Sequence, residues 1–267
     1  MSTENQWEHL RLTRHDNGVA LLRLDNPDQR NAMSEPMTTA WGEAVDLIAA
    51  DPEVRVVVVT GEGSAFCSGG NTSWIASEPD ATVDDLRSRM IAFYRAWLRI
   101  RELEVPTIAA VNGHAIGAGL CVALACDIRY AADGAKLGAP FVKLGLHPGM
   151  ASTWLLPDVV GLAHARELLL TGRVVEAEEA LRLGMVSRVL EPAGFLDGVL
   201  EIAAGVAATA PIPSKLTTLA LRDGGPATFE AAVQWEALAQ PITMATEDLQ
   251  EGIRAVQDKR AAQFRGR

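Results

Sequence analysis

The stretch that most constrains this chain is VNGHAIGAGLCVALACDI, at residues 111–128. It follows an apolar run at residues 107–111, so we expect a buried strand, a glycine-rich turn and an apolar helix that begins near Gly117. The first N–H groups of a helix have no partner inside the helix, and they lie at the positive end of its dipole. Because Gly113 and Gly119 carry no side chain, another group can approach this backbone closely.

A second glycine-bearing loop, SAFCSGGN at residues 64–71, follows a β-branched run at residues 56–60. Two such loops could aim two backbone N–H groups at one point, as an oxyanion site requires. The alternatives are a pair of tight turns beside a sheet, or a dinucleotide-binding loop. Neither loop has the G-x-G-x-x-G pattern after a strand, so we favour the oxyanion site.

The order and separation of these two loops resemble the enoyl-CoA hydratase/isomerase (crotonase) superfamily, and the resemblance extends over residues 21–264. It implies an α/β fold, a crotonase-like (ClpP/crotonase) spiral of repeated ββα units with a helical C-terminal segment. We expect the spiral core at residues 1–195 and the segment, a lid and oligomerisation module, at residues 196–267. In this family two backbone N–H groups polarise the carbonyl of an acyl-CoA thioester, and loop alignment places them on Gly70 and Ala118.

The acid/base positions depart from the family pattern. Resembling hydratases carry glutamates at the positions of Cys121 and Phe141, and resembling isomerases use the second of these. Water addition needs a base for water and an acid for the α-carbon, which neither residue supplies. We therefore expect an acyl-CoA-binding enzyme, nominally an enoyl-CoA hydratase (lyase), with poor ordinary hydratase activity. The alternatives are a non-catalytic acyl-CoA-binding protein, or an isomerase or thioester hydrolase with a relocated acid/base group such as His147.

Four polar side chains near the loops have alternative interpretations. His147 precedes the start of an expected helix, whose dipole would keep it neutral as a base, but loop carbonyls could equally satisfy it. Lys143 is expected to face solvent or pair with a carboxylate, and His114 to be structural or to line the pocket. Cys121 has apolar sequence neighbours, so we interpret it as a small buried side chain rather than a reactive thiolate.

The resemblance also suggests contacts with coenzyme A, which is part of the substrate. Arg30 matches a position where the family often places a basic residue, and Lys259 is a second candidate; for both, the alternative is a solvated surface charge. Asn71 replaces an aspartate common in the family. The residues expected to bind the substrate are Arg30, Ala32, Ser68, Gly70, Asn71, Thr72, Ile116, Gly117, Ala118, Pro140 and Phe141.

The acyl group is expected among apolar side chains that follow the first loop. A polar loop at residues 77–85 is typical of a segment that gates entry to a site. The candidates for the acyl pocket are Trp74, Ile75, Met90, Phe93, Tyr94 and Trp97. An aromatic-rich helix is also typical of a core element, so this alternative stays open.

Periodicity and turn residues predict alternating strands and helices, then mostly helices. Ser34 is expected to cap a helix that ends near residue 50, with Leu47 on its apolar face. The expected strands are at residues 8–14, 19–24, 54–60, 107–111, 127–131, 135–137 and 186–190. The other expected helices are at residues 83–102, 153–156, 162–170, 177–183, 196–208, 213–221, 229–239 and 246–263.

The composition of the chain excludes several classes of binding partner and cofactor. A net charge of −10 argues against nucleic acid and anionic membranes as partners. The polar N-terminus has no signal pattern, and no apolar run reaches membrane-spanning length without a charge, so we expect a cytoplasmic protein. Three cysteines give neither a disulfide framework nor zinc spacing, so we expect no metal and no resident cofactor. The family resemblance implies homotrimers or hexamers, with an apolar face on the last helix through Leu249, Ile253, Val256 and Phe264.

Overall fold

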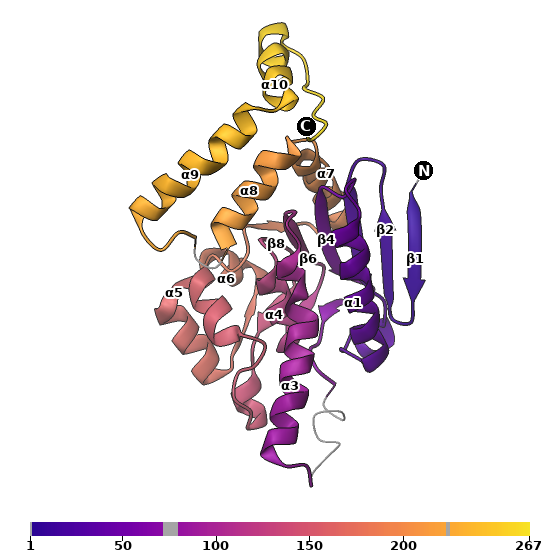
Figure 1. Cartoon of the computed structure of the whole chain (residues 1–267). Coiled ribbons are helices and arrows are strands. Elements are labelled where there is room, and N and C mark those ends of the chain that lie inside the picture. Colours follow the sequence, from indigo (N-terminus) through magenta and orange to yellow (C-terminus); the bar gives the residue numbers. More distant parts are fainter. Residues whose placement is uncertain (1, 72–79, 223–224) are drawn as a thin grey trace.

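The computed structural model of the chain describes residues 2–71, 80–222 and 225–267 (Figure 1). Within these residues the larger sheet has seven strands in the order β1-β2-β3-β4-β6-β8-β11. The first three strands pair antiparallel and the others pair parallel. Their bounds are Thr3–Trp7 (β1), Leu10–Arg14 (β2), Val19–Leu24 (β3), Val56–Gly61 (β4), Thr107–Val111 (β6), Ile128–Ala132 (β8) and Arg188–Leu190 (β11).

A smaller sheet in the same described part of the chain has four strands in the order β10-β9-β7-β5. These strands are Val174–Glu176 (β10), Lys136–Gly138 (β9), His114–Ile116 (β7) and Ala65–Cys67 (β5). Because β5 follows β4, β7 follows β6 and β9 follows β8, each step of the chain adds one strand to each sheet. This confirms the expected spiral of strand–strand–helix units.

Helices surround the two sheets and form most of the last third of the chain (Figure 1). Ser34 caps α1 as predicted, because its hydroxyl accepts the Met37 N–H. The predicted apolar face of α1 is wrong at one position: Leu47 is 38% exposed, and Val45 is buried instead. The helices are Glu35–Ala50 (α1), Val83–Leu98 (α3), Ala118–Ala125 (α4), Ser152–Thr171 (α5), Ala177–Arg182 (α6), Phe195–Ala207 (α7), Pro211–Leu221 (α8), Phe229–Met244 (α9) and Glu247–Asp258 (α10).

Both faces of the larger sheet are covered, which explains why β4 is a continuous β-branched run in which every residue is buried. One face packs against α1 and α4, and every residue of α4 is buried. The other face packs against α7 through Phe195, Val199 and Ala203. The expected division at residue 195 stays a prediction, although α7, which begins there, completes this second part of the core.

A hydrogen-bonded ion pair links the C-terminal helices to the core. The guanidinium of Arg222, after α8, donates to both carboxylate oxygens of Asp127, at 2.9 and 3.0 Å. Asp127 in turn accepts the N–H and hydroxyl of Thr107, both at 2.7 Å, at the start of β6. Beyond this tie, α9 and α10 extend away from the sheets (Figure 1), and α9 has no buried residue.

Several predicted boundaries are wrong. The strands β1, β5, β7 and β10 were not expected. The prediction of two helices, at residues 153–156 and 162–170, agrees with a break inside α5, where Gly161 has a non-helical φ of +76° and ψ of 157°. The last helix ends at Asp258, so Phe264 is not on its face and its ring packs back against Gly252. In the described part of the chain no single helix is long and apolar enough to cross a membrane. The helices α7 and α8 reach that length and apolar composition only when they are taken together, and the chain bends by 108° between them.

Candidate active site

The two glycine loops meet beside the smaller sheet. Strands β5 and β7 pair parallel, with Ala65 opposite His114, so the segments that follow both strands leave the same edge. A Cβ placed on Gly69 would lie 2.7 Å from the Ile116 carbonyl oxygen and 3.2 Å from the Ala118 nitrogen. Gly69 also has a φ of +94°, which L side chains rarely adopt. The first loop therefore reaches the start of α4 only because this residue is glycine.

Buried hydrogen bonds hold the first loop in place. The Asn31 side chain is fully buried, and its amide donates to the Glu62 and Ala65 carbonyls at 2.9 and 2.8 Å. Its side-chain oxygen accepts the Asn26 N–H at 2.9 Å. The Met33 N–H donates to the Gly69 carbonyl at 2.9 Å. Sequence analysis did not assign this role to Asn31, because the two carbonyls that its amide binds are more than thirty residues away.

Two backbone donors are available where the loops meet. Ala118 is the first residue of α4, so its N–H has no acceptor within the helix. Among the hydrogen bonds of the described residues, the Gly70 N–H has no backbone acceptor, because Gly70 forms its bridge to Met33 through neighbouring groups. These are the two groups that the sequence assigned to the oxyanion site. Their aim at one shared acceptor stays a prediction.

The two departed acid/base positions lie close to this point. The Phe141 ring is 3.8 Å from the Cβ position of Gly117, so it covers the turn that opens α4. The Cys121 side chain is completely buried, and its thiol donates to the Gly117 carbonyl at 3.2 Å. Burial raises the pKa of Cys121 to about 12. Cys121 is therefore an uncharged thiol at neutral pH and cannot serve as a general base or as a thiolate nucleophile.

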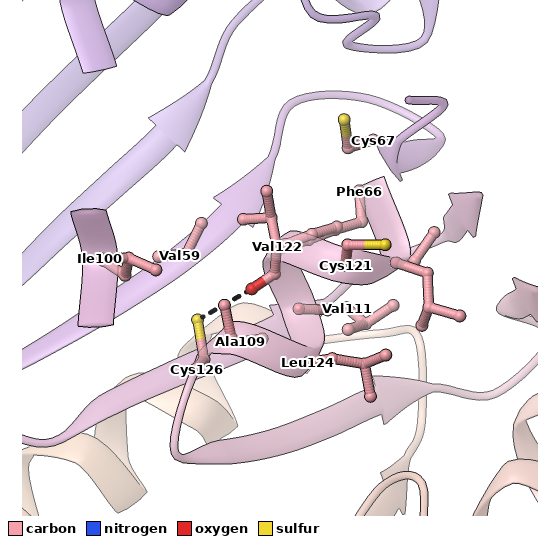
Figure 2. Close-up of a cluster of buried hydrophobic side chains, with 14 of the residues drawn as sticks. Val59, Phe66, Cys67, Ile100, Ala109, Val111, Cys121, Val122, Leu124 and Cys126 are labelled. Carbon is pink, nitrogen blue, oxygen red and sulfur yellow. Dashed lines mark hydrogen bonds between the residues drawn. The ribbon is translucent and has the colours of Figure 1, made fainter. Parts of the chain in front are cut away.

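All three cysteines are free thiols with buried side chains. Burial raises the pKa of each thiol to about 12. Figure 2 shows Cys67 and Cys121 near Phe66, whereas Cys126 lies at the opposite end of α4. There its sulfur contacts the Val122 carbonyl at 3.5 Å. Within residues 2–71, 80–222 and 225–267, no group of three His, Cys, Asp or Glu side chains could hold a metal ion.

The structure favours the second interpretation of His147, in which a loop carbonyl contacts its ring. The helix α5 begins at Ser152, close to the expected start at residue 153, and His147 lies in the loop before it. His147 is exposed, and its Nδ1 lies 2.8 Å from the carbonyl of its own neighbour, Pro148. Lys143 and His114 are also exposed.

The residues assigned to coenzyme A fall into two groups. Arg30 is exposed, and its carbonyl accepts the Ser68 N–H at 3.0 Å, which places both at the first loop with Ala32. The second group adjoins α4 and contains Ile116, Gly117, Pro140 and Phe141, with the Gly117 N–H bonded to the Gly138 carbonyl. Lys259 lies apart from both loops in the sequence, where it ends α10.

The expected acyl pocket stays a prediction, and one of its candidates belongs to the core. Trp97 is fully buried, and its ring stacks against Trp41 with centroids 4.8 Å apart, so it belongs to the core. Phe93 and Tyr94, on the same helix, are partly buried beside this core. Asn71 is described, whereas Thr72, Trp74, Ile75 and residues 77–79 of the polar loop lie outside the described residues.

Comparisons with known proteins agree with this arrangement. The family model for enoyl-CoA hydratase/isomerase matches residues 14–267. The chain belongs to this family. It is 35% identical over 251 residues to (E)-benzylidenesuccinyl-CoA hydratase of Thauera aromatica, covering 94% of this chain and 96% of that protein. It is 34% identical over 247 residues to crotonyl-CoA hydratase of Syntrophomonas wolfei, covering 92% and 94%. The crystal structure of an enoyl-CoA hydratase from Bacillus anthracis matches with a TM-score of 0.90 at 29% identity, covering 97% of this chain and 100% of that one.

Family membership and the structure together confirm the crotonase fold expected from the two loops. Sequence analysis did not predict that the hydroxyls of two side chains lie near Cys121. Tyr94 was assigned to the acyl pocket, and Ser152 was not considered. No local pattern marks either residue, because Tyr94 on α3 and Ser152 on α5 approach Cys121 only through packing against α4.

Proposed function

We propose that this chain binds an acyl-CoA thioester and polarises the thioester carbonyl between the N–H groups of Gly70 and Ala118. This would stabilise the enolate that forms when the α-carbon gains or loses a proton. The observation that carries the proposal is the close approach of the first loop to the start of α4, where a Cβ on Gly69 would lie 3.2 Å from the Ala118 nitrogen. A single donor of this kind contributes about a hundred- to a thousandfold to kcat.

The substrate class that we propose is an α,β-unsaturated acyl-CoA. The named relatives are hydratases of unsaturated thioesters, and the chain matches more than nine-tenths of their length. Hydration by a pair of carboxylates is not part of the proposal, because a thiol and a phenyl ring stand at Cys121 and Phe141. Coenzyme A belongs to the substrate, and the proposed chemistry calls on no resident cofactor.

A second candidate is a protein that binds thioesters and does not turn them over. It is favoured by the same two side chains: Phe141 covers Gly117, and Cys121 is an uncharged thiol. One experiment separates the candidates. Butyryl-CoA binding by calorimetry and loss of crotonyl-CoA absorbance are measured on the same purified sample. Binding with turnover supports the enzyme, binding alone supports the second candidate, and no binding of either thioester refutes both.

We also propose that the chain assembles into homotrimers or hexamers. The support is the apolar surface of α9 and α10, where Phe229 is 84% exposed and Val256 is 80% exposed. Leu238 and Met244 are exposed on the same helices. Such a surface is typical of an interface between subunits. Light scattering of the full chain tests this, and a monodisperse monomer would contradict it.

A further inference from the structure

A cavity of about 490 Å³ lies between α8 and the core, beside the C-terminal end of α4. This volume is typical of small-molecule sites, which enclose about 300–1,000 Å³. The lining includes Cys126, which ends α4, whereas the proposed thioester site adjoins Ala118, the first residue of that helix. The eight residues of α4 separate its two ends by about 12 Å, so the cavity is distinct from the thioester site.

One wall of the cavity is apolar. It includes Leu124 of α4 and Leu155 of α5, which are buried, and Val206 of α7, which is partly buried. On the side of α8 the lining includes the hydroxyls of Ser214 and Thr217. Thr217 is exposed, so a small molecule can reach the cavity from this side. A ligand that fits this lining therefore has an apolar body and a polar end.

The polar group best placed to hold a ligand is the guanidinium of Arg129, in β8. Its Nε donates to the Met185 carbonyl at 2.9 Å, and its Nη1 donates to the Cys126 carbonyl at 2.6 Å. These two bonds fix the orientation of the side chain. Its Nη2 donates to no other described residue and is not fully enclosed, so its N–H groups are available in the cavity that Arg129 lines.

The charges around the cavity leave Arg129 without a close counter-ion among the described residues. Asp127 is paired with Arg222, at 2.9 Å. Asp158 also lines the cavity, but it is exposed and forms no ion pair with Arg129. Burial lowers the pKa of the Arg129 guanidinium, which stays charged at neutral pH because an arginine ordinarily titrates above about 12. With Arg101, the described lining has three arginines against two aspartates, a net positive charge in a chain of net charge −10.

We propose that this cavity binds a small monocarboxylate with an unbranched apolar chain. The carboxylate accepts the Nη2 N–H groups of Arg129, and the chain lies against the wall of Leu124 and Leu155. A guanidinium withdrawn from water gains more from an anion than an exposed one does, because the lower dielectric strengthens the attraction. An inorganic anion would leave the apolar wall unused, and a neutral hydrocarbon would leave the cation unpaired. The proposal does not rest on the thioester site.

The experiment measures octanoate binding to the full chain by calorimetry, with butyryl-CoA in excess so that the thioester site is occupied. We expect one octanoate per chain. Octanol keeps only the apolar part of this ligand and inorganic phosphate keeps only an anion, so each should bind about tenfold or more weakly than octanoate. If butyryl-CoA does not bind, the same titration without it tests the cavity through the variants below.

The variant Arg129→Gln removes the charged donor and should weaken octanoate binding about tenfold or more. Arg55→Gln is the matched control, because the Arg55 guanidinium also donates to two backbone carbonyls, at 3.3 and 3.0 Å, and is not part of this cavity. It should keep the octanoate affinity of wild type. Thermal unfolding of both variants shows whether the chain still folds without these bonds.

A second variant tests the cavity with Arg129 in place. Thr217→Phe adds a ring on the exposed side of the cavity and should abolish octanoate binding, because the ring occupies the space of the apolar chain. Leu219→Phe is its control, because Leu219 lies on the same helix, is 40% exposed and is not part of the cavity lining. This control should bind octanoate as wild type does.

Four results would overturn the inference. The first is octanoate binding that folded Arg129→Gln and Thr217→Phe leave unchanged, because the ligand would then lie elsewhere. The second is displacement of octanoate by butyryl-CoA, which would place octanoate in the thioester site. The third is phosphate or octanol binding as tight as that of octanoate, and the fourth is no binding of octanoate by wild type. Failure of butyryl-CoA to bind would count against the proposed function alone.

Discussion

Replacing Cys121 and Phe141 by glutamate tests whether these two positions decide the rate of hydration. The two sites differ in their surroundings. Cys121 is fully buried, with the Gly117 and Gly149 carbonyl oxygens 3.2 and 3.6 Å from its sulfur. Burial of a carboxyl in such a place raises its pKa by about 3–5 units, and the carbonyl oxygens disfavour the anion further. The Cys121→Glu carboxyl is therefore expected to be protonated at pH 7 and to give little gain as a base.

The Phe141→Glu variant should also gain little alone. Phe141 is partly buried against Gly117, and a shorter carboxylate placed there lacks a partner to direct a water. General acid and base groups contribute about a hundred- to ten-thousandfold each when they act on a positioned proton. We expect the double variant to exceed the product of the two single gains in kcat/KM by about tenfold or more, because both groups would act on one water.

The assay is the steady-state loss of crotonyl-CoA absorbance for wild type, both single variants and the double variant. Phe141→Leu is the control for loss of the ring without a carboxylate, and thermal unfolding measures the cost of a larger side chain at Cys121, about 1–3 kcal/mol. A double variant no faster than the better single variant would refute the reasoning. So would wild-type turnover of about 10 per second or more, the median of characterised enzymes, because another residue would then carry the proton.

Three further predictions follow from the fold and the loops. Ala118→Pro removes one N–H at the first helical position, where proline is tolerated, so kcat should fall about a hundred- to a thousandfold with unfolding temperature nearly unchanged; an unchanged kcat would contradict the oxyanion assignment. Arg222→Leu should lower the free energy of unfolding in urea by about 3–5 kcal/mol, because it leaves the Asp127 carboxylate without its cationic partner, whereas the exposed Arg267→Leu should cost about 0–1; equal losses would refute the argument. Truncation after Gln240 should cause aggregation measured by light scattering, and a soluble truncated protein would contradict the proposed interface.

Sequence analysis predicted the elements whose signals are local. The β-branched run of β4 and the Ser34 cap of α1 are visible within a few residues, and both are confirmed. The strands β5, β7 and β10 are three residues long, and they exist because each pairs with a strand distant in sequence. No short window can show such pairing, so these strands were interpreted as loops.

In the candidate site, too, some residues carry a local sequence pattern and others do not. Gly70 and Ala118 were assigned from the family resemblance of the two glycine loops, and the structure brings these loops into contact, while the role of the two N–H groups stays a prediction. For His147 the sequence left two interpretations open, because only the folded loop shows that its ring meets the Pro148 carbonyl. Ser152 carries no pattern at all, since an unpartnered hydroxyl can be recognised only after burial has been determined.

Packing of the fold fixes the backbone of the two loops, but it does not fix all the side chains around α4. A Cβ on Gly119 would overlap the Cys67 carbonyl, and one on Gly69 would crowd the Ala118 nitrogen, whatever reaction follows. The packing of β5 against α4 thus requires the same backbone that forms the proposed thioester site, so this site cannot be lost without disturbing the fold. The side chains at the acid/base positions are not required by this packing in the same way. For this reason the two loops indicate a proposed substrate class, whereas the reaction must be argued from side chains such as Cys121 and Phe141.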